Sequence, residues 1–256
     1  MRVMSFNILM GGGPPDRFAR VCGVVSRARP DVLVLQECLG WEDNDRLAQV
    51  AAAAGLAHSR LGVARPRGSG RRFHVALLSR WPIVEVRLHN DPKVVGHCVL
   101  EARLDWSGEP LWILGTHLDS HGEDQRMVEA KLLCERMPAG PGVLVGDLNA
   151  LSPRDPYAAE LSERLWQGGV HKYGHPLRHD VIEALEAAGW IDSLHMGGAP
   201  AQWVTAPRER GGVRFDSRTD YTMVTPALRD RVVSTEITDI EMPAVSDHAP
   251  VVLTLR

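Results

Sequence analysis

Short runs of apolar residues recur along the whole chain, and their pattern predicts a fold rich in β-strands. Alternating or unbroken apolar positions, bounded by Gly, Pro, Asn or Asp, are typical of strands. By this criterion we predict strands at residues 2–8, 32–35, 75–78, 84–88, 94–104, 111–116, 143–145, 220–224, 232–237 and 251–255. No linker, repeat or low-complexity segment separates them, so we expect a single domain over residues 1–256.

Apolar residues spaced three and four apart predict helices between these strands. The first helix should begin behind an N-cap at Asp16 and end near Arg29, because Pro30 cannot continue it. Further helices are expected at residues 45–54, 123–136, 157–165 and 180–188. In the helix at 123–136, the residues expected to face the core are Met127, Ala130, Leu133 and Cys134.

The composition is that of a soluble globular protein, with 44% hydrophobic and 24% charged residues. The net charge of −3 gives no strong overall attraction to nucleic acid, although a local basic groove stays open. The four cysteines lack the paired spacing of a zinc site or a disulfide framework. We find no signal-peptide core and no membrane-spanning segment. We therefore expect a cytoplasmic protein without membrane insertion, and no obligate protein partner is evident.

The stretch Val143–Asn149 carries the clearest candidate chemistry. Three apolar residues read as a buried strand, which Gly146 should end with a tight turn. Asp147 and Asn149 follow two residues apart, so in extended backbone both point to one side. The carboxylate can hold or deprotonate a water molecule, and the amide can hydrogen-bond a phosphate oxygen. The alternative is an ordinary turn, since Gly, Asp and Asn are common turn residues.

Other predicted strands also end in polar groups that suit a ligand site. Asn7, Glu37 and Asp220 stand at strand ends, and two loops supply His117 and His248. Ligand groups gather at strand ends in α/β sheets. Each residue also has a purely structural explanation, and sequence spacing alone does not show that they converge.

Arginine dominates the basic residues, and only three of the 29 are lysine. The guanidinium forks of two Gly-containing segments could face phosphate groups, or the segments could be solvated loops. A biased genome composition would give the same excess of arginine. The first segment contains Arg65, Arg67, Arg71 and Arg72, and the second contains Arg208, Arg210, Arg214 and Arg218.

Six short motifs together resemble the endonuclease/exonuclease/phosphatase superfamily, which includes nucleases, repair enzymes, phosphatases and sphingomyelinases. The resemblance implies a four-layer α/β sandwich of two packed mixed sheets flanked by helices, as in DNase I. It also implies phosphoester hydrolysis with a divalent metal, Mg²⁺ with Mn²⁺ as a possible substitute. The motifs occur in the family's order and are Ser5–Ile8, Leu35–Glu37, Thr116–Leu118, Gly146–Asn149, Thr219–Tyr221 and Ser246–His248.

The resemblance also implies a role for each candidate residue. Asn7 and Glu37 match metal-site positions, and Asp247 matches an acidic residue sometimes assigned to metal. Asp147 and Asn149 match the residues that direct water and bind phosphate. His248 matches the catalytic histidine with Asp220 as its carboxylate partner, and His117 matches a phosphate-contacting position. Substrate contacts are expected from Asn7, His117, Asn149, Arg71 and Arg72.

The substrate class stays open between a nucleic acid and a small-molecule or lipid-headgroup phosphoester. Leu9 stands where abasic-site repair enzymes commonly have an acidic or amide residue, which together with His117 disfavours that activity. The motif loops of inositol polyphosphate phosphatases are not evident. A different class of function is a non-catalytic binding protein on the same fold. It is disfavoured because the expected catalytic residues are all present.

Overall fold

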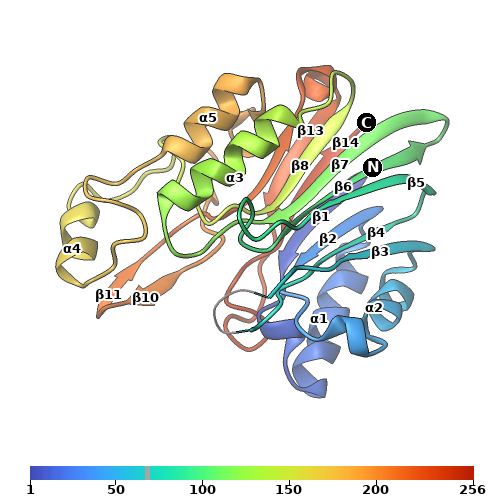
Figure 1. Cartoon of the computed structure of the whole chain (residues 1–256), viewed down its shortest axis with the longest axis horizontal. Coiled ribbons are helices and arrows are strands. Elements are labelled where there is room, and N and C mark those ends of the chain that lie inside the picture. The colour runs from blue at the N-terminus through green and yellow to red at the C-terminus, as the bar shows by residue number, and fades with distance from the viewer. Residues whose placement is uncertain (67–69) are drawn as a thin grey trace.

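The computed structural model describes residues 1–66 and 70–256, and two mixed β-sheets form its centre (Figure 1). In the first sheet β1 and β2 are parallel, and the other neighbouring strands are antiparallel. Its strand order is β13 (Val232–Ile237), β14 (Val251–Leu255), β1 (Arg2–Asn7), β2 (Val32–Gln36), β4 (Val75–Ser79) and β3 (His58–Gly62).

The second sheet has the same number of strands and also one parallel pair, β7 with β8. Its outer strands are antiparallel to their neighbours. The strand order is β5 (Ile83–His89), β6 (Cys98–Trp106), β7 (Glu109–His117), β8 (Gly142–Asp147), β12 (Asp220–Val224) and β9 (Ile191–Asp192).

Three apolar clusters hold four layers together. Between the sheets, Val34 and Leu77 pack with Ile113 and Val145. Helices α1 (Pro15–Ala28) and α2 (Arg46–Ala54) cover the first sheet, and α3 (Glu123–Glu135) and α5 (Asp180–Ala188) cover the second (Figure 1). The expected four-layer α/β sandwich is confirmed. Short 3-10 helices lie at Met10–Gly12, Trp41–Asp43, Ser193–His195 and Pro226–Arg231.

A smaller unit projects from one end of the sandwich, from the part of the chain between β8 and β12 (Figure 1). It consists of α4 (Leu161–Gln167), the following loop with Lys172 and Tyr173, and a hairpin of β10 (Arg208–Arg210) and β11 (Val213–Phe215). Its own apolar cluster includes Leu165, Tyr173 and Phe215. We call this unit the arm.

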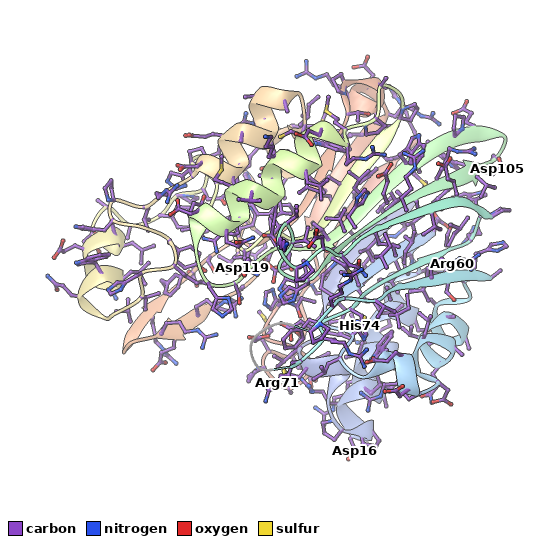
Figure 2. All side chains as sticks on the ribbon, viewed as in Figure 1. Asp16, Arg60, Arg71, His74, Asp105 and Asp119 are labelled. Atoms are coloured by element: carbon purple, nitrogen blue, oxygen red, sulfur yellow. The ribbon has the colours of Figure 1, made fainter. Side chains whose placement is uncertain are left out.

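Most predicted strands are confirmed, and the errors have local causes. The N-cap assignment of Asp16 is wrong, because α1 begins at Pro15 after Pro14 and Asp16 lies in its exposed first turn (Figure 2). Strand β3 and the β10–β11 hairpin were not predicted, since both are short and rich in polar residues. The helix expected at 157–165 begins only at Leu161.

Gly146 does not end its strand, because β8 continues through Asp147. The residue has φ +154°, and a Cβ atom at this position would lie 2.0 Å from the Thr116 carbonyl oxygen of β7. Glycine is therefore required for the close approach of two strands rather than for a turn. This approach brings the end of β7 against the end of β8.

None of the helices in residues 1–66 and 70–256 combines the length and the apolar character needed to cross a bilayer.

Candidate active site

Strand register places three of the candidate residues in one row across the second sheet. His117 at the end of β7 pairs with Asp147 at the end of β8, and Asp147 pairs with Asp220 at the start of β12. On the first sheet, Asn7 ends β1 and Glu37 follows β2. The site therefore lies where the ends of both sheets meet, and the structure brings together strand ends whose convergence the sequence alone did not show.

The carboxylate of Asp147 is the centre of this cluster. Its Oδ2 accepts a hydrogen bond from Asn7 Nδ2 at 3.0 Å and lies 3.6 Å from His117 Nε2 and 3.7 Å from His248 Nε2. Its Oδ1 accepts from the backbone N–H of Asn149 at 2.9 Å. With only 1% of the residue exposed, these contacts replace the solvation that the ion would have in water.

Burial alone would raise the pKa of Asp147, but the charges of His248, His117 and Arg208 hold it at about 2. The carboxylate is therefore ionised at any pH near neutrality. Such a group is a weak base, so it is better suited to accepting a hydrogen bond than to removing a proton.

Asp220 and His248 form the expected pair, although 28 residues separate them. Asp220 Oδ2 lies 2.8 Å from His248 Nδ1, which fixes the ring. Burial would lower the pKa of His248, but the charges of Asp220 and Asp147 raise it to about 9. The ring is thus an imidazolium at neutral pH.

The charged ring leaves its other nitrogen in an unsatisfied position. His248 Nε2 lies 2.9 Å from Arg208 Nη2, and a guanidinium can only donate. Two donors then face each other, and neither accepts from its neighbour. An oxygen acceptor within hydrogen-bond reach of both groups would satisfy both.

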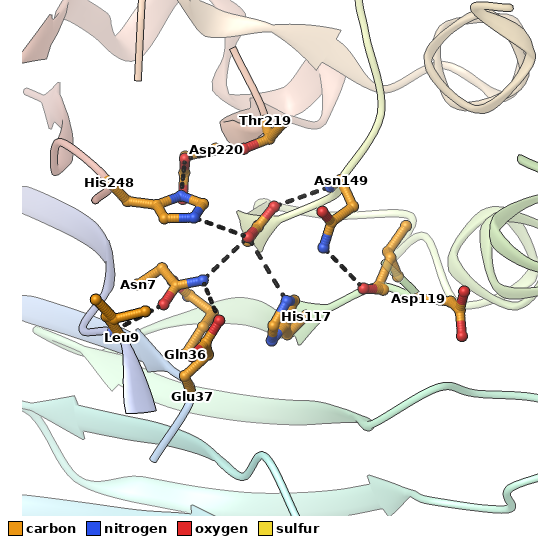
Figure 3. Close-up of polar contacts among 12 residues, drawn as sticks. Asn7, Leu9, Gln36, Glu37, His117, Asp119, Asn149, Thr219, Asp220 and His248 are labelled. Carbon is orange, nitrogen blue, oxygen red and sulfur yellow. Dashed lines mark hydrogen bonds and ion pairs between the residues drawn. The ribbon is translucent and has the colours of Figure 1, made fainter. Parts of the chain in front are cut away.

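Glu37 and Asn7 lie side by side on the opposite wall of the site (Figure 3). Glu37 has φ +60°, a strained conformation for a residue with a side chain, and Leu9 and Met10 nearby are also left-handed. Glu37 Oε2 accepts from the Met10 backbone at 2.8 Å, and Oε1 lies 3.3 Å from Asn7 Nδ2. Strained backbone therefore holds this carboxylate at the pocket wall.

Several oxygen atoms of the site fit a hard divalent cation. The carboxylates of Glu37, Asp147 and Asp247 line the pocket, and no cysteine is among its described lining residues. The Asp247 Oδ1 atom is buried and has no hydrogen-bond partner among the described residues. Asn7 fits less well as a ligand, because its Oδ1 accepts from Leu9 N at 3.1 Å and its NH₂ group faces the carboxylates.

Asp147, Asp220 and His248 also offer atoms close enough to hold one ion. However, the short contact between His248 and Asp220 already uses the ring nitrogen and the carboxylate oxygen that lie nearest each other. Glu37 and Asp247 therefore stay the better ligand candidates of this site.

Asn149 stands at φ +51°, which asparagine adopts more readily than most residues. Its Nδ2 donates to the Leu118 carbonyl oxygen at 3.1 Å, so the amide links the ends of β7 and β8. Its Oδ1 lies 3.4 Å from Lys172 Nζ. The backbone at Asn149 is therefore not extended as predicted, and the contact of its N–H with Asp147 Oδ1 is that of a turn. Both residues nevertheless line the same cavity.

The cluster opens into a cavity of about 830 Å³. Of the first arginine segment, Arg71 lines this cavity, whereas Arg65 is not among its described lining residues. Arg72 instead forms an ion pair with Glu42, so the structure does not bring it to the pocket. Arg67 lies outside the described residues.

Helix α3 holds the loops around the cavity with a buried charged face, where apolar periodicity predicted only an apolar one. Arg126 donates to the backbone oxygens of Asp119 at 3.0 Å and Lys172 at 2.6 Å. Glu129 accepts from the backbone N–H of Gly96 and, at 2.8 Å, from that of Asp119. Figure 2 shows Asp119 beside this end of α3. Ala130 and Leu133 are buried as expected.

Among the residues that line the cavity, Lys172, Phe73 and His97 were not identified as site candidates from the sequence. Arg208 also lines it and belongs to the second arginine segment, for which a phosphate-facing role and a solvated loop were both open. Lys172 and Arg208 belong to irregular polar segments that gave no periodic signal. Phe73, His97 and His117 form an aromatic wall, with ring centroids 5.4 Å and 4.4 Å apart. His97 follows Gly96 in a bend, and nothing in the local sequence distinguishes it from a surface histidine.

Comparisons with known proteins agree with this fold. A model of the Endonuclease/Exonuclease/phosphatase family matches residues 4–248. A search of curated proteins finds no significant match.

Three solved structures share the fold over 100% of this chain and 99% of their own. One is an endonuclease/exonuclease/phosphatase family protein from Leptotrichia buccalis C-1013-b, with a TM-score of 0.72 and 12% identity. Another is the 3′ phosphatase NExo from Neisseria bound to product DNA hairpin, with a TM-score of 0.70 and 20% identity. The third is an AP endonuclease from Archaeoglobus fulgidus, with a TM-score of 0.67 and 18% identity.

Proposed function

The chain belongs to the endonuclease/exonuclease/phosphatase family, and we propose from this premise that it is a Mg²⁺-dependent hydrolase of phosphoesters. The observation that carries the proposal is the buried Asp147 carboxylate, ringed by Asn7, His117 and His248. A carboxylate held among donors at the floor of an open cavity suits the orientation of a water molecule. The cytoplasmic location expected from the sequence is part of the same proposal.

Each residue has a distinct task in this reaction. Asp147 accepts a hydrogen bond from the attacking water and aligns it with phosphorus. His117 and Asn149 contact phosphoryl oxygens beside it. His248, held by Asp220, donates to the oxygen on which negative charge gathers. A divalent metal held by Glu37 and Asp247 would supply neutralisation of phosphate charge.

The substrate is either a nucleic acid or a small phosphorylated molecule. The names of two structural neighbours, a 3′ phosphatase bound to a DNA hairpin and an AP endonuclease, favour nucleic acid. A screen of DNA, RNA, phosphomonoesters and phospholipids with added Mg²⁺ tests the proposal. Phosphate-ligand binding without hydrolysis of any substrate would favour the non-catalytic alternative.

Removal of the metal is expected to abolish hydrolysis, with Mg²⁺ or Mn²⁺ restoring it. Glu37→Gln should weaken the apparent Mg²⁺ affinity, because a neutral amide binds a hard cation less strongly than a carboxylate. Activity titrations and calorimetry with Mg²⁺ measure this. Glu241→Gln is the control, since Glu241 has a side chain 79% exposed in a surface pair with Arg20. Full activity in excess chelator would contradict the metal requirement.

Arg71→Ala is expected to raise KM by about threefold to tenfold, with a smaller effect on kcat. Arg71 lines the cavity, so its guanidinium should contact the substrate rather than the reacting atoms. Arg72→Ala is the matched control, because that neighbour pairs with Glu42 instead. Steady-state kinetics of both variants decide the point. Equal KM values for Arg71→Ala and Arg72→Ala would return this segment to the solvated-loop interpretation.

A further inference from the structure

Arg208 of the β10–β11 hairpin reaches from the arm into the catalytic cavity. Its Nη1 donates to Asp247 Oδ2 at 3.0 Å, and its Nη2 lies 2.9 Å from His248 Nε2. The side chain is only 10% exposed, and its buried Nε has no hydrogen-bond partner among the described residues. A buried guanidinium N–H without an acceptor is costly, so this position favours an incoming anion.

Lys172 brings a second cation from the arm to the same cavity. Within residues 1–66 and 70–256, no carboxylate lies within ion-pair distance of its ammonium group. Its contacts are Asn149 Oδ1 at 3.4 Å and the ring of Tyr173, 4.7 Å from the ring centroid. Burial and the positive charge of Arg208 lower the pKa of Lys172 to about 7. Arg208 pairs with Asp247, whereas among the described residues no carboxylate forms an ion pair with Lys172. A phosphoryl anion bound beside this amine would favour its charged form.

Both cations contact residues to which the proposed reaction assigns the scissile phosphoryl group. Lys172 adjoins Asn149, and Arg208 adjoins His248. Resting on the proposed function, we propose that Lys172 and Arg208 form an anion subsite that selects a phosphoryl group with two negative charges. The preferred substrates are then phosphomonoesters rather than phosphodiesters.

The choice of a monoester follows from counting donors and acceptors. A phosphodiester has two non-bridging oxygens that share one charge, whereas a monoester dianion has three that share two. The cavity presents His117, Asn149 and His248, and the arm adds the two cations. The third phosphoryl oxygen of a monoester gives Lys172 and Arg208 an acceptor. The second negative charge compensates the repulsion between these two cations.

The arm holds both cations by contacts that do not involve a ligand. Arg126 of α3 donates to the backbone oxygen of Lys172, and Tyr173 next to it is buried in the apolar cluster of the arm. Phe215 of β11 belongs to that cluster and pairs in register with Arg208. The subsite is therefore built into the fold before a ligand arrives, which lowers the cost of ordering it.

Binding of two small probes tests the proposal without catalysis. At pH 7, methyl phosphate is mainly a dianion, and dimethyl phosphate carries one charge. Calorimetry in excess chelator, where the proposed hydrolysis does not proceed, should show methyl phosphate binding at least tenfold more tightly to the native protein. Arg208→Met and Lys172→Met should each weaken methyl phosphate binding by roughly 10- to 100-fold, with little effect on dimethyl phosphate.

The matched control is Arg214→Met, on the same hairpin but 86% exposed and paired with Glu209. It should bind both probes like the native protein. Arg208→Lys keeps the charge without the fork, so it should recover part of the preference if the charge matters. Circular dichroism checks that each variant is folded. If Arg208→Met does not fold, Lys172→Met still tests the subsite, because this substitution leaves the backbone contact of residue 172 with Arg126 in place.

Kinetics with p-nitrophenyl phosphate and its methyl diester separate this proposal from the proposed function. Both esters share a leaving group, so their ratio of kcat/KM reports the charge preference. A selective loss of monoester hydrolysis in Arg208→Met supports the subsite. Equal losses on both esters, or equal binding of the two probes to the native protein, would overturn it. Selective binding of methyl phosphate without any hydrolysis would overturn only the proposed function.

Discussion

Replacing Asp147 with asparagine is expected to lower kcat by roughly 10²- to 10⁴-fold, the range usual for loss of a positioned acid or base. The native Oδ2 accepts from Asn7 and faces two histidine rings. An amide NH₂ in its place would present a donor to three other donors, and it could not accept a hydrogen bond from water. The charge that keeps the pKa of His248 high would also be reduced.

Single-turnover kinetics with saturating substrate and Mg²⁺ measure this loss at the chemical step. Asp230→Asn changes the same functional group at an exposed position and is the control. Thermal melting of both variants separates a catalytic effect from unfolding. If Asp147→Asn has the same kcat as the native protein, another residue must orient the water.

The residues at strand ends could be predicted because their strands could. Each apolar run ends where the chain leaves the core, so Asn7, Asp147 and Asp220 were identified as polar groups at the rim of a sheet. What brings them together is strand register, which pairs Asp147 with both His117 and Asp220. Register depends on pairings between strands far apart in the sequence, and no local pattern encodes it.

The cationic wall of the site could not be predicted in the same way. Lys172 lies in a polar loop and Arg208 in a three-residue strand with no apolar position. Both are placed by the small apolar cluster of the arm, whose members come from separate segments. The buried charges Arg126 and Glu129 also escaped prediction, because periodicity assigns charged helix positions to solvent. Here they face inward to hold backbone groups of two loops.

The pairing of Asp220 with His248 leads to a prediction on pH. The proposed reaction requires the imidazolium of His248, which persists up to the raised pKa of about 9. Asp220→Asn removes the largest contribution that raises this pKa, so it should fall toward the ordinary value of 6.5. We therefore expect a lower kcat at neutral pH and an alkaline limb of the kcat profile that moves to lower pH.

Stability provides a second readout of the same charge. A histidine with a raised folded-state pKa stabilises the fold fully below its unfolded value of 6.5, and this contribution is lost as pH rises through about 9. The difference in Tm between the native protein and Asp220→Asn should therefore be larger at pH 6 than at pH 9.5. Equal differences at both values would mean that the carboxylate does not stabilise the charged ring.

The double variant Asp220→Asn with His248→Ala decides whether the carboxylate acts through the ring. His248→Ala alone should lower kcat by roughly 10²- to 10⁴-fold, since it removes the donor to the phosphoryl oxygens. Because Asp220 touches the substrate only through His248 in the proposed reaction, the second substitution should add little. A double-mutant cycle of kcat values measures this coupling directly. Additive losses would show that Asp220 has an independent role, such as holding the metal together with Asp147, and would refute its assignment as the partner of His248.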